Sequence, residues 1–323
     1  MIRVIITFLG GLLIACLGFF ALLKFIEDKP VPNAVFSQSI IDAKLSSARS
    51  FASTPKTVVV GGSNVLFGID SQLLGELTGR RVLNFGCAAG FGPELILHLL
   101  KPHLHSGDSV IMRWEYHQYL FTRSGTVNLT YLNLLTSTQN EFMRELPIYD
   151  RTRLCLSIPV SLCWEGVQTA YNPFVNADLY KCSWAIDSMG NVRSNLGVKI
   201  NDSEMGNDFF DPNSSFKITA DVDDIFSDFV KFCRHKKISI IVSWPNVAFQ
   251  DDHAHSLVQK KIECINEFWR DLDVVVLGRP VNYMFKKHDL YDTVYHLNQR
   301  GVRKCTKLLA DDLADWFYGS VGN

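Results

Sequence analysis

One unbroken apolar run dominates the first thirty residues of the chain. It extends from Val4 to Leu23 and reads VIITFLGGLLIACLGFFALL. In a helix, about 20 residues at 1.5 Å each cross the roughly 30 Å hydrocarbon core of a bilayer. A buried helix of this length in a globular protein would show a polar face, and this run has none. The pattern therefore predicts a membrane anchor at residues 1–30.

The charges that flank the run predict its orientation. Arg3 and the α-amino group precede it, and the residues that follow have mixed sign, namely Lys24, Glu27, Asp28 and Lys29. This asymmetry favours an N-terminus on the inside. A cleaved signal peptide is the alternative, but the run is longer than a usual h-region and no A-x-A site follows it. We therefore expect a single-pass protein of the cell inner membrane, with its globular part on the periplasmic or extracytoplasmic side.

The pattern after residue 56 alternates between short β-branched runs and segments with helical spacing. Strands are expected at Thr57–Val60, from Val82, at Ser109–Trp114, Ile238–Trp244 and Val274–Leu277. Helices are expected at Ile69–Leu77, Leu95–Leu104, Val222–Cys233, His255–Trp269 and Gly301–Phe317. Strands that alternate with helices are typical of an α/β fold, with a parallel sheet and crossover helices on both faces.

The periodicity is poor between Phe121 and Lys217, where turn residues are common. We interpret residues 31–323 as one domain with an irregular insertion at about 121–217, which is a candidate lid or partner surface. Within it, Ala185–Asn191 resembles the tip of a hairpin. Pro30, Pro32 and Asn33 are expected to form a short stiff spacer behind the anchor.

Composition narrows the class of protein. Hydrophobic residues make up 47% and charged residues 20% of the chain, which suits a packed globule, and the formal charge is −1 at pH 7. Because no stretch is seen to concentrate cations on one face, we expect no nucleic-acid partner. The eight cysteines show no zinc-ligand spacing. Cys155, Cys163 and Cys182 are close enough in sequence for one disulfide, although buried thiols are the favoured interpretation.

The first candidate chemical group is Ser63 in the segment VVVGGSN (58–64). It follows the first expected strand, and the carboxyl ends of parallel strands are where α/β sheets bind their ligands. The two glycines allow a sharp turn and a close approach of substrate. Backbone N–H groups at the start of the following helical stretch can face a developing oxyanion. Such a Gly-Gly-Ser sequence is also common in ordinary turns.

The second candidate group is the pair Asp292 and His296, just before the last expected helix. A carboxylate against one ring nitrogen fixes the tautomer and leaves the other nitrogen to take a proton from a serine. Alternatively, Asp292 caps a turn and His296 lies on the surface. Asp251-Asp-His-Ala-His255 suggests a metal cluster only superficially, because it begins a helix, where acids are favourable. We expect no metal and no cofactor.

Taken together, these segments resemble the SGNH (GDSL-like) hydrolases over roughly Thr57–Tyr116 and Ile238–Phe317. VVVGGSN resembles the first sequence block of that family, NFGCAAGFG (84–92) its second, and DTVYHLNQRG (292–301) its last. The resemblance implies a flavodoxin-like three-layer fold with Ser63 as nucleophile, Asp292 as the orienting acid and His296 as the base. It also implies an oxyanion hole formed by Ser63 and Gly90, with Gly86 as the alternative to Gly90.

Two departures from the family pattern stand out. The last block is usually D-x-x-H, whereas here the spacing is one residue longer and Asp289 is a rival carboxylate. The third block, G-x-N-D, is absent, and RWEYH (113–117) stands in its place. Losing one oxyanion donor typically costs about 2.7–4 kcal/mol of transition-state stabilisation. Asn64, Glu115 and Tyr116 are candidates for substrate binding.

With its membrane segment, the chain is similar to bacterial alginate-acetylation accessory proteins and to the protein of teichoic-acid D-alanylation. The resemblance implies a serine-dependent reaction beside a membrane-bound O-acyltransferase. The reaction is either transfer of an acyl group, acetyl being the first expectation, to a cell-surface polysaccharide, or hydrolysis of such a group from it. A non-catalytic subunit that keeps the fold and binds a glycan or a membrane partner is the alternative. A free lipase or thioesterase is less favoured, because the anchor ties activity to the membrane.

Overall fold

The computed structural model describes residues 2–26, 32–52, 55–123, 139–158, 160–171, 185–193, 197 and 207–318. The chain divides into two compact units. The first, here called the helical unit, comprises Met1–Ser39 and Arg123–Cys182. The second, here called the α/β unit, comprises Ile40–Thr122 and Ser183–Asn323.

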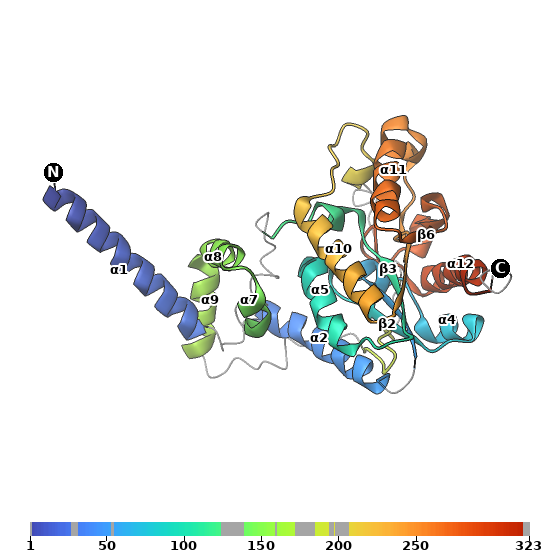
Figure 1. The fold of residues 1–323 in the computed structure, drawn as a ribbon, viewed down its shortest axis with the longest axis horizontal. Coiled ribbons are helices and arrows are strands. Elements are labelled where there is room, and N and C mark those ends of the chain that lie inside the picture. Colours follow the sequence, from blue (N-terminus) through green and yellow to red (C-terminus); the bar gives the residue numbers. More distant parts are fainter. Residues whose placement is uncertain are drawn as a thin grey trace. The chain divides into compact units, whose positions relative to one another are not determined.

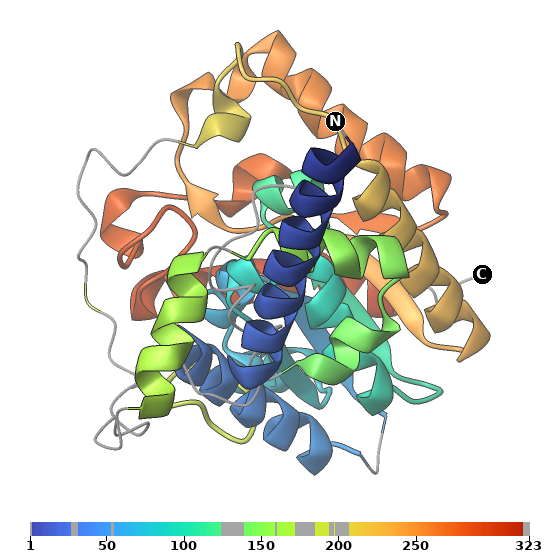
Figure 2. The same ribbon diagram turned by 90° about the vertical axis from the view of Figure 1, so that its left-hand side faces the viewer.

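The helical unit contains the apolar N-terminal run as helix α1 (Ile2–Ile26), drawn in dark blue in Figures 1 and 2. It is long and apolar enough to cross a membrane, as expected. The inserted region also contributes helices, which the sequence interpretation missed: α7 (Asn140–Glu145), α8 (Ile148–Leu156) and α9 (Val160–Tyr171). They are short, so their periodic pattern is weak, and α8 begins directly after Pro147, which reads as a turn signal in the sequence.

The spacer expected behind the anchor is wrong for Pro32 and Asn33. Both belong to helix α2 (Pro32–Ser50), which runs from the helical unit into the α/β unit. Proline is well tolerated at the first position of a helix, where its missing N–H leaves no bond unmade. Pro30 lies outside the described residues.

The α/β unit is built on a five-stranded parallel sheet in the order β2-β1-β3-β4-β6. Its strands are β1 (Thr57–Gly61), β2 (Val82–Gly86), β3 (Ser109–Arg113), β4 (Ser239–Ser243) and β6 (Val275–Leu277). All residues of β1, β2 and β3 are buried, which explains their continuous apolar character. From β1 the chain builds outward to β2 and then crosses back to β3. The carboxyl ends of β1 and β3 therefore form the switch point at which such sheets open a crevice.

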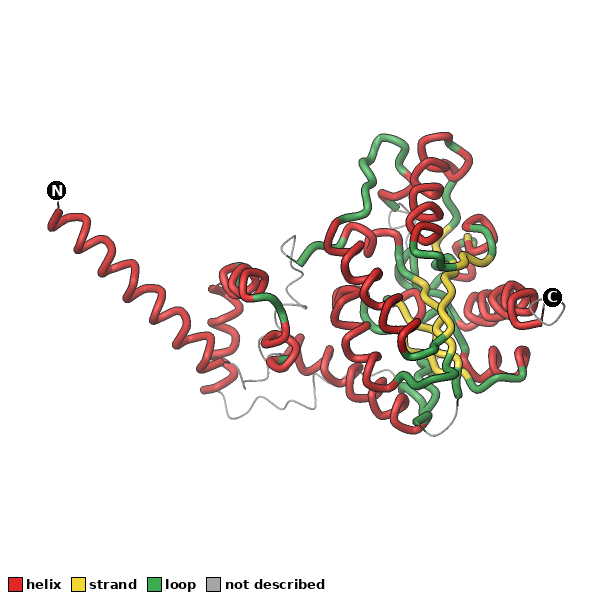
Figure 3. Tube along the Cα trace, viewed as in Figure 1, coloured by secondary structure: helices red, strands yellow, loops and turns green. Residues whose placement is uncertain are grey.

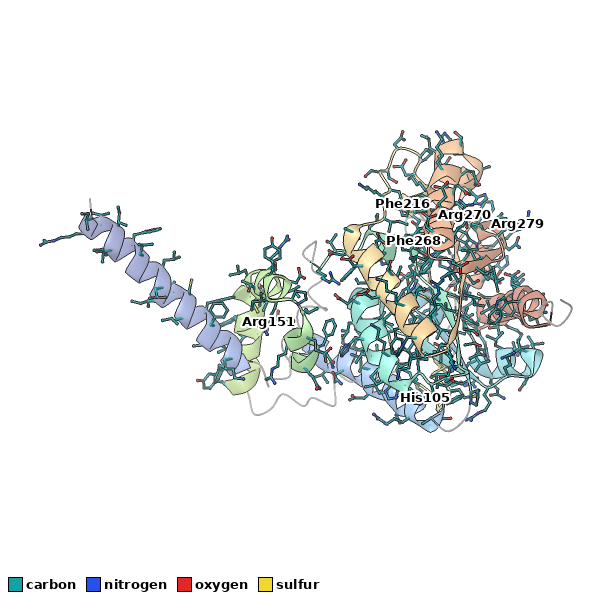
Figure 4. All side chains as sticks on the ribbon, viewed as in Figure 1. His105, Arg151, Phe216, Phe268, Arg270 and Arg279 are labelled. Carbon is teal, nitrogen blue, oxygen red and sulfur yellow. The ribbon has the colours of Figure 1, made fainter. Side chains whose placement is uncertain are left out.

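Helices cover both faces of the sheet, as Figures 1 and 3 show. Helices α5 (Gly92–Leu100) and α10 (Ala220–His235) pack together on one face, whereas α4 (Ser71–Thr78) and α12 (Gln299–Tyr318) pack together on the other. Helix α11 (Ser256–Asp271) precedes β6. In the core, Trp269 of α11 stacks on Phe226 at 5.0 Å and meets its neighbour Phe268, which Figure 4 labels, edge-on. The α/β class with a parallel sheet flanked by helices is confirmed.

Short elements complete the unit. Helix α3 (Ser63–Leu66) follows β1, and β5 (Val247–Ala248) pairs with β7 (Met284–Phe285) in a small parallel sheet. The 3-10 turns are η1 (Ala89–Phe91), η2 (Lys101–His103), η3 (Tyr116–Leu120), η6 (Asp208–Phe210), η7 (Asp251–Ala254), η8 (Pro280–Tyr283) and η9 (Lys287–Asp289). The hairpin tip expected at Ala185–Asn191 is present, since Ile186 and Val192 form an antiparallel bridge.

The expectation that no stretch concentrates cations on one face needs correction. Arg300, Arg303, Lys304 and Lys307 lie at i, i+3, i+4 and i+7 of α12, so one helix face does concentrate cations. The net charge of the segment does not reveal this face, because apolar residues separate the cations and acidic residues follow them.

Among the candidates for a disulfide, Cys155 carries a free thiol, whereas the side chain of Cys163 and all of Cys182 lie outside the described residues.

A buried ion pair lies at the amino ends of β1 and β3. Asp108 accepts hydrogen bonds from Lys56 Nζ at 2.6 Å, Lys56 N at 2.9 Å and His105 N at 2.8 Å. Replacing Asp108 with Ala leaves these donors, including a buried ammonium, without their acceptor. We expect Asp108→Ala to lower the free energy of unfolding by about 3–5 kcal/mol, as measured by urea denaturation in detergent.

The matched control is Asp228→Ala. Asp228 pairs with Lys231 on the exposed surface of α10, where ion pairs contribute little. Equal urea midpoints for the two variants would contradict the role given to the buried pair.

Candidate functional site

Ser63 lies at the carboxyl end of β1, as the first residue of helix α3. Two glycines precede it, and the second lies close to other segments: a Cβ on Gly62 would lie 2.9 Å from Glu115 Oε1 and 3.2 Å from Ala89 Cβ. The turn after β1 thus approaches both the segment that follows β3 and the start of η1. Close packing requires glycine at the preceding position, because a Cβ on Gly61 would collide with the backbone of Arg113.

The hydroxyl of Ser63 donates a hydrogen bond to Glu115 Oε1 at 2.7 Å. Glu115 is only 1% exposed, and the same oxygen accepts the backbone N–H of Asn64 at 2.8 Å. The Glu115 side chain also accepts the backbone N–H of Gln118 and so caps η3. Because Ser63 follows β1 and Glu115 follows β3, this contact lies at the switch point of the sheet.

Asp292 and His296 form the expected pair. His296 Nδ1 is 2.7 Å from Asp292 Oδ1, and their side chains are 14% and 37% exposed respectively. The loop that carries them is closed by a bridge between Leu290 and Leu297 and by a hydrogen bond from Tyr291 N to His296 O. With a carboxylate at Nδ1, the favoured tautomer has its proton there and keeps a lone pair on Nε2.

The rival carboxylate is engaged elsewhere. Asp289 is 3% exposed and pairs with Lys304 Nζ at 2.6 Å and Arg300 Nε at 3.1 Å, both on α12. Its geometry anchors the start of α12. Of the two carboxylates, Asp292 is the one in contact with the His296 ring.

Packing connects the loop of His296 with the turn of Ser63. The ring of Phe67 lies 4.3 Å from that of His296, and Phe67 N donates to Ser63 O at 2.9 Å. His117, after β3, has its ring 5.8 Å from that of Tyr295 and its Nδ1 3.5 Å from Glu115 Oε2. The structure thus gathers the three segments at one edge of the sheet. Within the described residues, however, the hydrogen bond of the Ser63 hydroxyl runs to Glu115 and none joins Ser63 to His296.

Of the two glycines considered for the oxyanion hole, Gly86 has a backbone N–H that is already hydrogen-bonded. The N–H of Gly86 donates to Asn84 Oδ1 at 2.9 Å, and a Cβ on Gly86 would collide with the backbone of Leu66. Gly86 is therefore a packing residue, and its N–H is not available to an oxyanion. Gly90 lies within η1, next to Ala89 and hence beside the Gly62 turn. Its role as a donor stays a prediction.

The candidates for substrate binding are largely enclosed. Asn64 is fully buried, and its Nδ2 donates to Arg113 O at 3.2 Å, so its side chain ties α3 to β3. Tyr116 is 1% exposed and stacks on Phe209 at 4.0 Å. Burial raises the pKa of Tyr116 well above its ordinary value and, together with the Glu115 carboxylate, raises the pKa of Tyr295. Both phenols are therefore neutral at physiological pH.

Three polar residues that support the site are absent from the sequence prediction. Asn246, between β4 and β5, donates from Nδ2 to Tyr295 O at 2.7 Å and so holds the His296 loop. Asn298 Nδ2 donates to His288 O and Leu290 O, while its Oδ1 accepts Gly301 N. Asn84 Nδ2 donates to Val65 O of α3 and to Ile69 O in the segment before α4. The available signal was position: Asn246 follows a strand, and Asn298 precedes a helix, where Asn is a preferred cap.

A cavity of about 320 Å³ lies beside Phe67. Its lining mixes apolar side chains with hydrogen-bonding ones, among them Asp70, Gln72, Glu76, Arg193, Gln299 and Arg303. This volume lies in the range of small-molecule sites. Phe67 also contacts His296, but neither His296 nor Asp292 lines the cavity itself.

The described residues contain no group of three His, Cys, Asp or Glu side chains that could hold a metal ion. In the Asp251–His255 segment, the acids begin the 3-10 turn η7, and the cap of α11 is His255, whose Nδ1 accepts Leu257 N at 3.2 Å. The expected helix start is thus shifted to Ser256.

The fold and site define an α/β protein with an N-terminal helix long and apolar enough to cross a membrane, and with a serine and a His–Asp pair at one edge of its parallel sheet. No protein-family model matches the chain, and no curated protein matches it. It is similar to the crystal structure of protein YXIM from Bacillus subtilis, with 12% sequence identity and a TM-score of 0.39. The match covers 82% of this chain and 58% of that one. A likeness this weak assigns neither a family nor a function.

Proposed function

We propose that the protein is an SGNH-type serine acyltransferase or esterase that acts on a cell-surface polysaccharide from the extracytoplasmic side of the membrane. The observation that carries the proposal is the 2.7 Å contact between His296 Nδ1 and Asp292 Oδ1. The His296 ring packs against Phe67, which lies one helical turn after Ser63. The proposal includes an inner-membrane location and work beside a membrane-bound O-acyltransferase, which presents the acyl group.

The proposed reaction has two steps, formation of an acyl ester on Ser63 and transfer of the acyl group from it. Ser63 Oγ attacks the acyl carbonyl while His296 Nε2 takes the hydroxyl proton. The donor's leaving group then departs with that proton, and an acyl ester remains on Ser63. A sugar hydroxyl, or water in the esterase case, attacks this ester after giving its proton to Nε2, and the proton returns to Ser63 as the product leaves. Asp292 stabilises the imidazolium in both steps.

Before the first step, the Ser63 hydroxyl must turn from Glu115 towards His296. The backbone N–H groups of Ser63 and Gly90 are proposed to stabilise the oxyanion, without the donor that the third-block Asn would add. The cavity beside Phe67 is proposed to hold the acceptor sugar, because its amides and charged groups suit hydroxyl recognition.

We expect Ser63→Ala to abolish covalent labelling by a fluorophosphonate probe and to abolish acyl transfer, since the substitution removes the proposed nucleophile, Oγ. The measurement is in-gel fluorescence of the full-length protein in detergent, with mass spectrometry of the modified peptide. Ser106→Ala, in an exposed turn, is the matched control and keeps the labelling. Labelling that persists in Ser63→Ala would refute the serine mechanism.

The hydrogen bond between Ser63 and Glu115 favours a second candidate function, a non-catalytic subunit that keeps the fold and binds a glycan or a membrane partner. In this alternative the serine is part of a packed polar cluster. Burst hydrolysis of an activated acetate ester separates the two: the enzyme shows a burst that Ser63→Ala lacks, whereas the subunit shows none.

A further inference from the structure

Large apolar side chains are exposed on two helices of the helical unit. Each of them is between 60% and 76% exposed: Ile148, Tyr149 and Leu156 of α8, and Trp164 and Tyr171 of α9. Soluble surfaces tolerate single residues of this kind, but a group that includes Trp and Tyr on adjacent helices indicates an interaction surface.

The position of α9 relative to α1 indicates what this surface meets. The ring of Tyr171, the last residue of α9, stacks on that of Phe25 with 6.1 Å between centroids and 28° between planes. The stretch of α1 that is apolar enough to cross a membrane ends at Leu22, so Phe25 lies about one turn beyond it. The end of α9 is therefore at the level where α1 leaves the hydrocarbon core.

The chemistry of the two helices suits that level. Trp and Tyr are enriched at the boundary between lipid and water, where an apolar ring with a polar tip is favoured. Helix α8 adds Arg151, labelled in Figure 4, and Arg153, whose guanidinium lies 5.4 Å from the Tyr149 ring centre. Arginines beside such aromatics can reach anionic headgroups while their stems remain in apolar surroundings.

We propose that α8 and α9 rest in the interfacial layer of the membrane that α1 crosses, with Trp164 and Tyr171 inserted among the lipid headgroups. The aromatic contact with the end of α1 favours lipid over a protein partner as the occupant. This inference goes beyond the proposed function and does not depend on any activity of Ser63.

The test uses the full-length protein in nanodiscs of phosphatidylethanolamine and phosphatidylglycerol that contain a phospholipid with a diazirine on its acyl chain near the headgroup. After illumination, mass spectrometry locates the labelled peptides. We expect label on α8 and α9 as well as on α1. Leu77, Phe249 and Val281 of the α/β unit are exposed apolar controls, and their peptides should label at least fivefold less.

The double variant Trp164→Ser/Tyr171→Ser should lower the labelling of α9 about fivefold without changing that of α1. The matched control is Leu77→Ser, which leaves the labelling of α8 and α9 unchanged. Labelling of α8 and α9 no greater than that of the Leu77 peptide would overturn the proposal. The proposal would also be overturned if a protein that copurifies from the membrane suppressed the labelling of α8 and α9 and left that of α1 unchanged.

Discussion

His296→Ala is expected to lower the rate of fluorophosphonate labelling at Ser63 by about 10⁴-fold, because it removes the imidazole that packs beside the Ser63 turn and is oriented by Asp292 at 2.7 Å. Asp292→Asn should produce a loss of similar order, since an amide can turn its N–H towards Nδ1 and favour the wrong tautomer. Labelling rates are measured with full-length protein in detergent over a range of probe concentrations.

The structure provides a matched control for Asp292. Asp289→Asn changes a neighbouring carboxylate of the same loop, but Asp289 pairs with Lys304 and Arg300 and not with the imidazole. This variant should lose stability and keep its labelling rate within about threefold. If Asp289→Asn slowed labelling as much as Asp292→Asn, the orienting role of Asp292 would have to be abandoned.

The alternation of apolar strands and amphipathic helices was sufficient to predict the parallel sheet. Strands β1 and β4 are short β-branched runs, and helices α10 and α11 each have a strong apolar face. Strong local patterns of this kind survive in the folded protein because the same residues form the core. The stop of α4 was also predictable, since Gly79 adopts φ +65°.

The helices of the insertion and the partners of Ser63 could not be predicted in the same way. Helices α8 and α9 expose much of their apolar surface, so the usual amphipathic pattern of a soluble helix is blurred. The contact of Ser63 with Glu115 joins residues 52 positions apart and depends on strand order, which brings β1 beside β3. The pairing of Asp292 with His296 was accessible because it lies within one loop.

Glu115→Ala is expected to lower the free energy of unfolding by about 3–5 kcal/mol, the largest stability effect at the site. The buried carboxylate accepts hydrogen bonds from the Ser63 hydroxyl and from the backbone N–H groups of Asn64 and Gln118. Alanine leaves these donors without their acceptor, and since Asn64 and Gln118 are buried, each of their unpaired N–H groups is costly. Urea denaturation of the full-length protein, followed by circular dichroism, measures the change.

The conservative variant Glu115→Gln separates packing from control of the nucleophile. Glutamine keeps an acceptor oxygen of the same size, so most of the stability should remain. Its neutral oxygen holds the Ser63 hydroxyl less firmly than a carboxylate does, because charge-assisted hydrogen bonds are about twice as strong. If the Ser63 hydroxyl must leave Glu115 to reach His296, labelling of Glu115→Gln should be about fivefold faster than that of the native protein. Slower labelling in a stable Glu115→Gln protein would mean instead that the charge of Glu115 assists the serine directly.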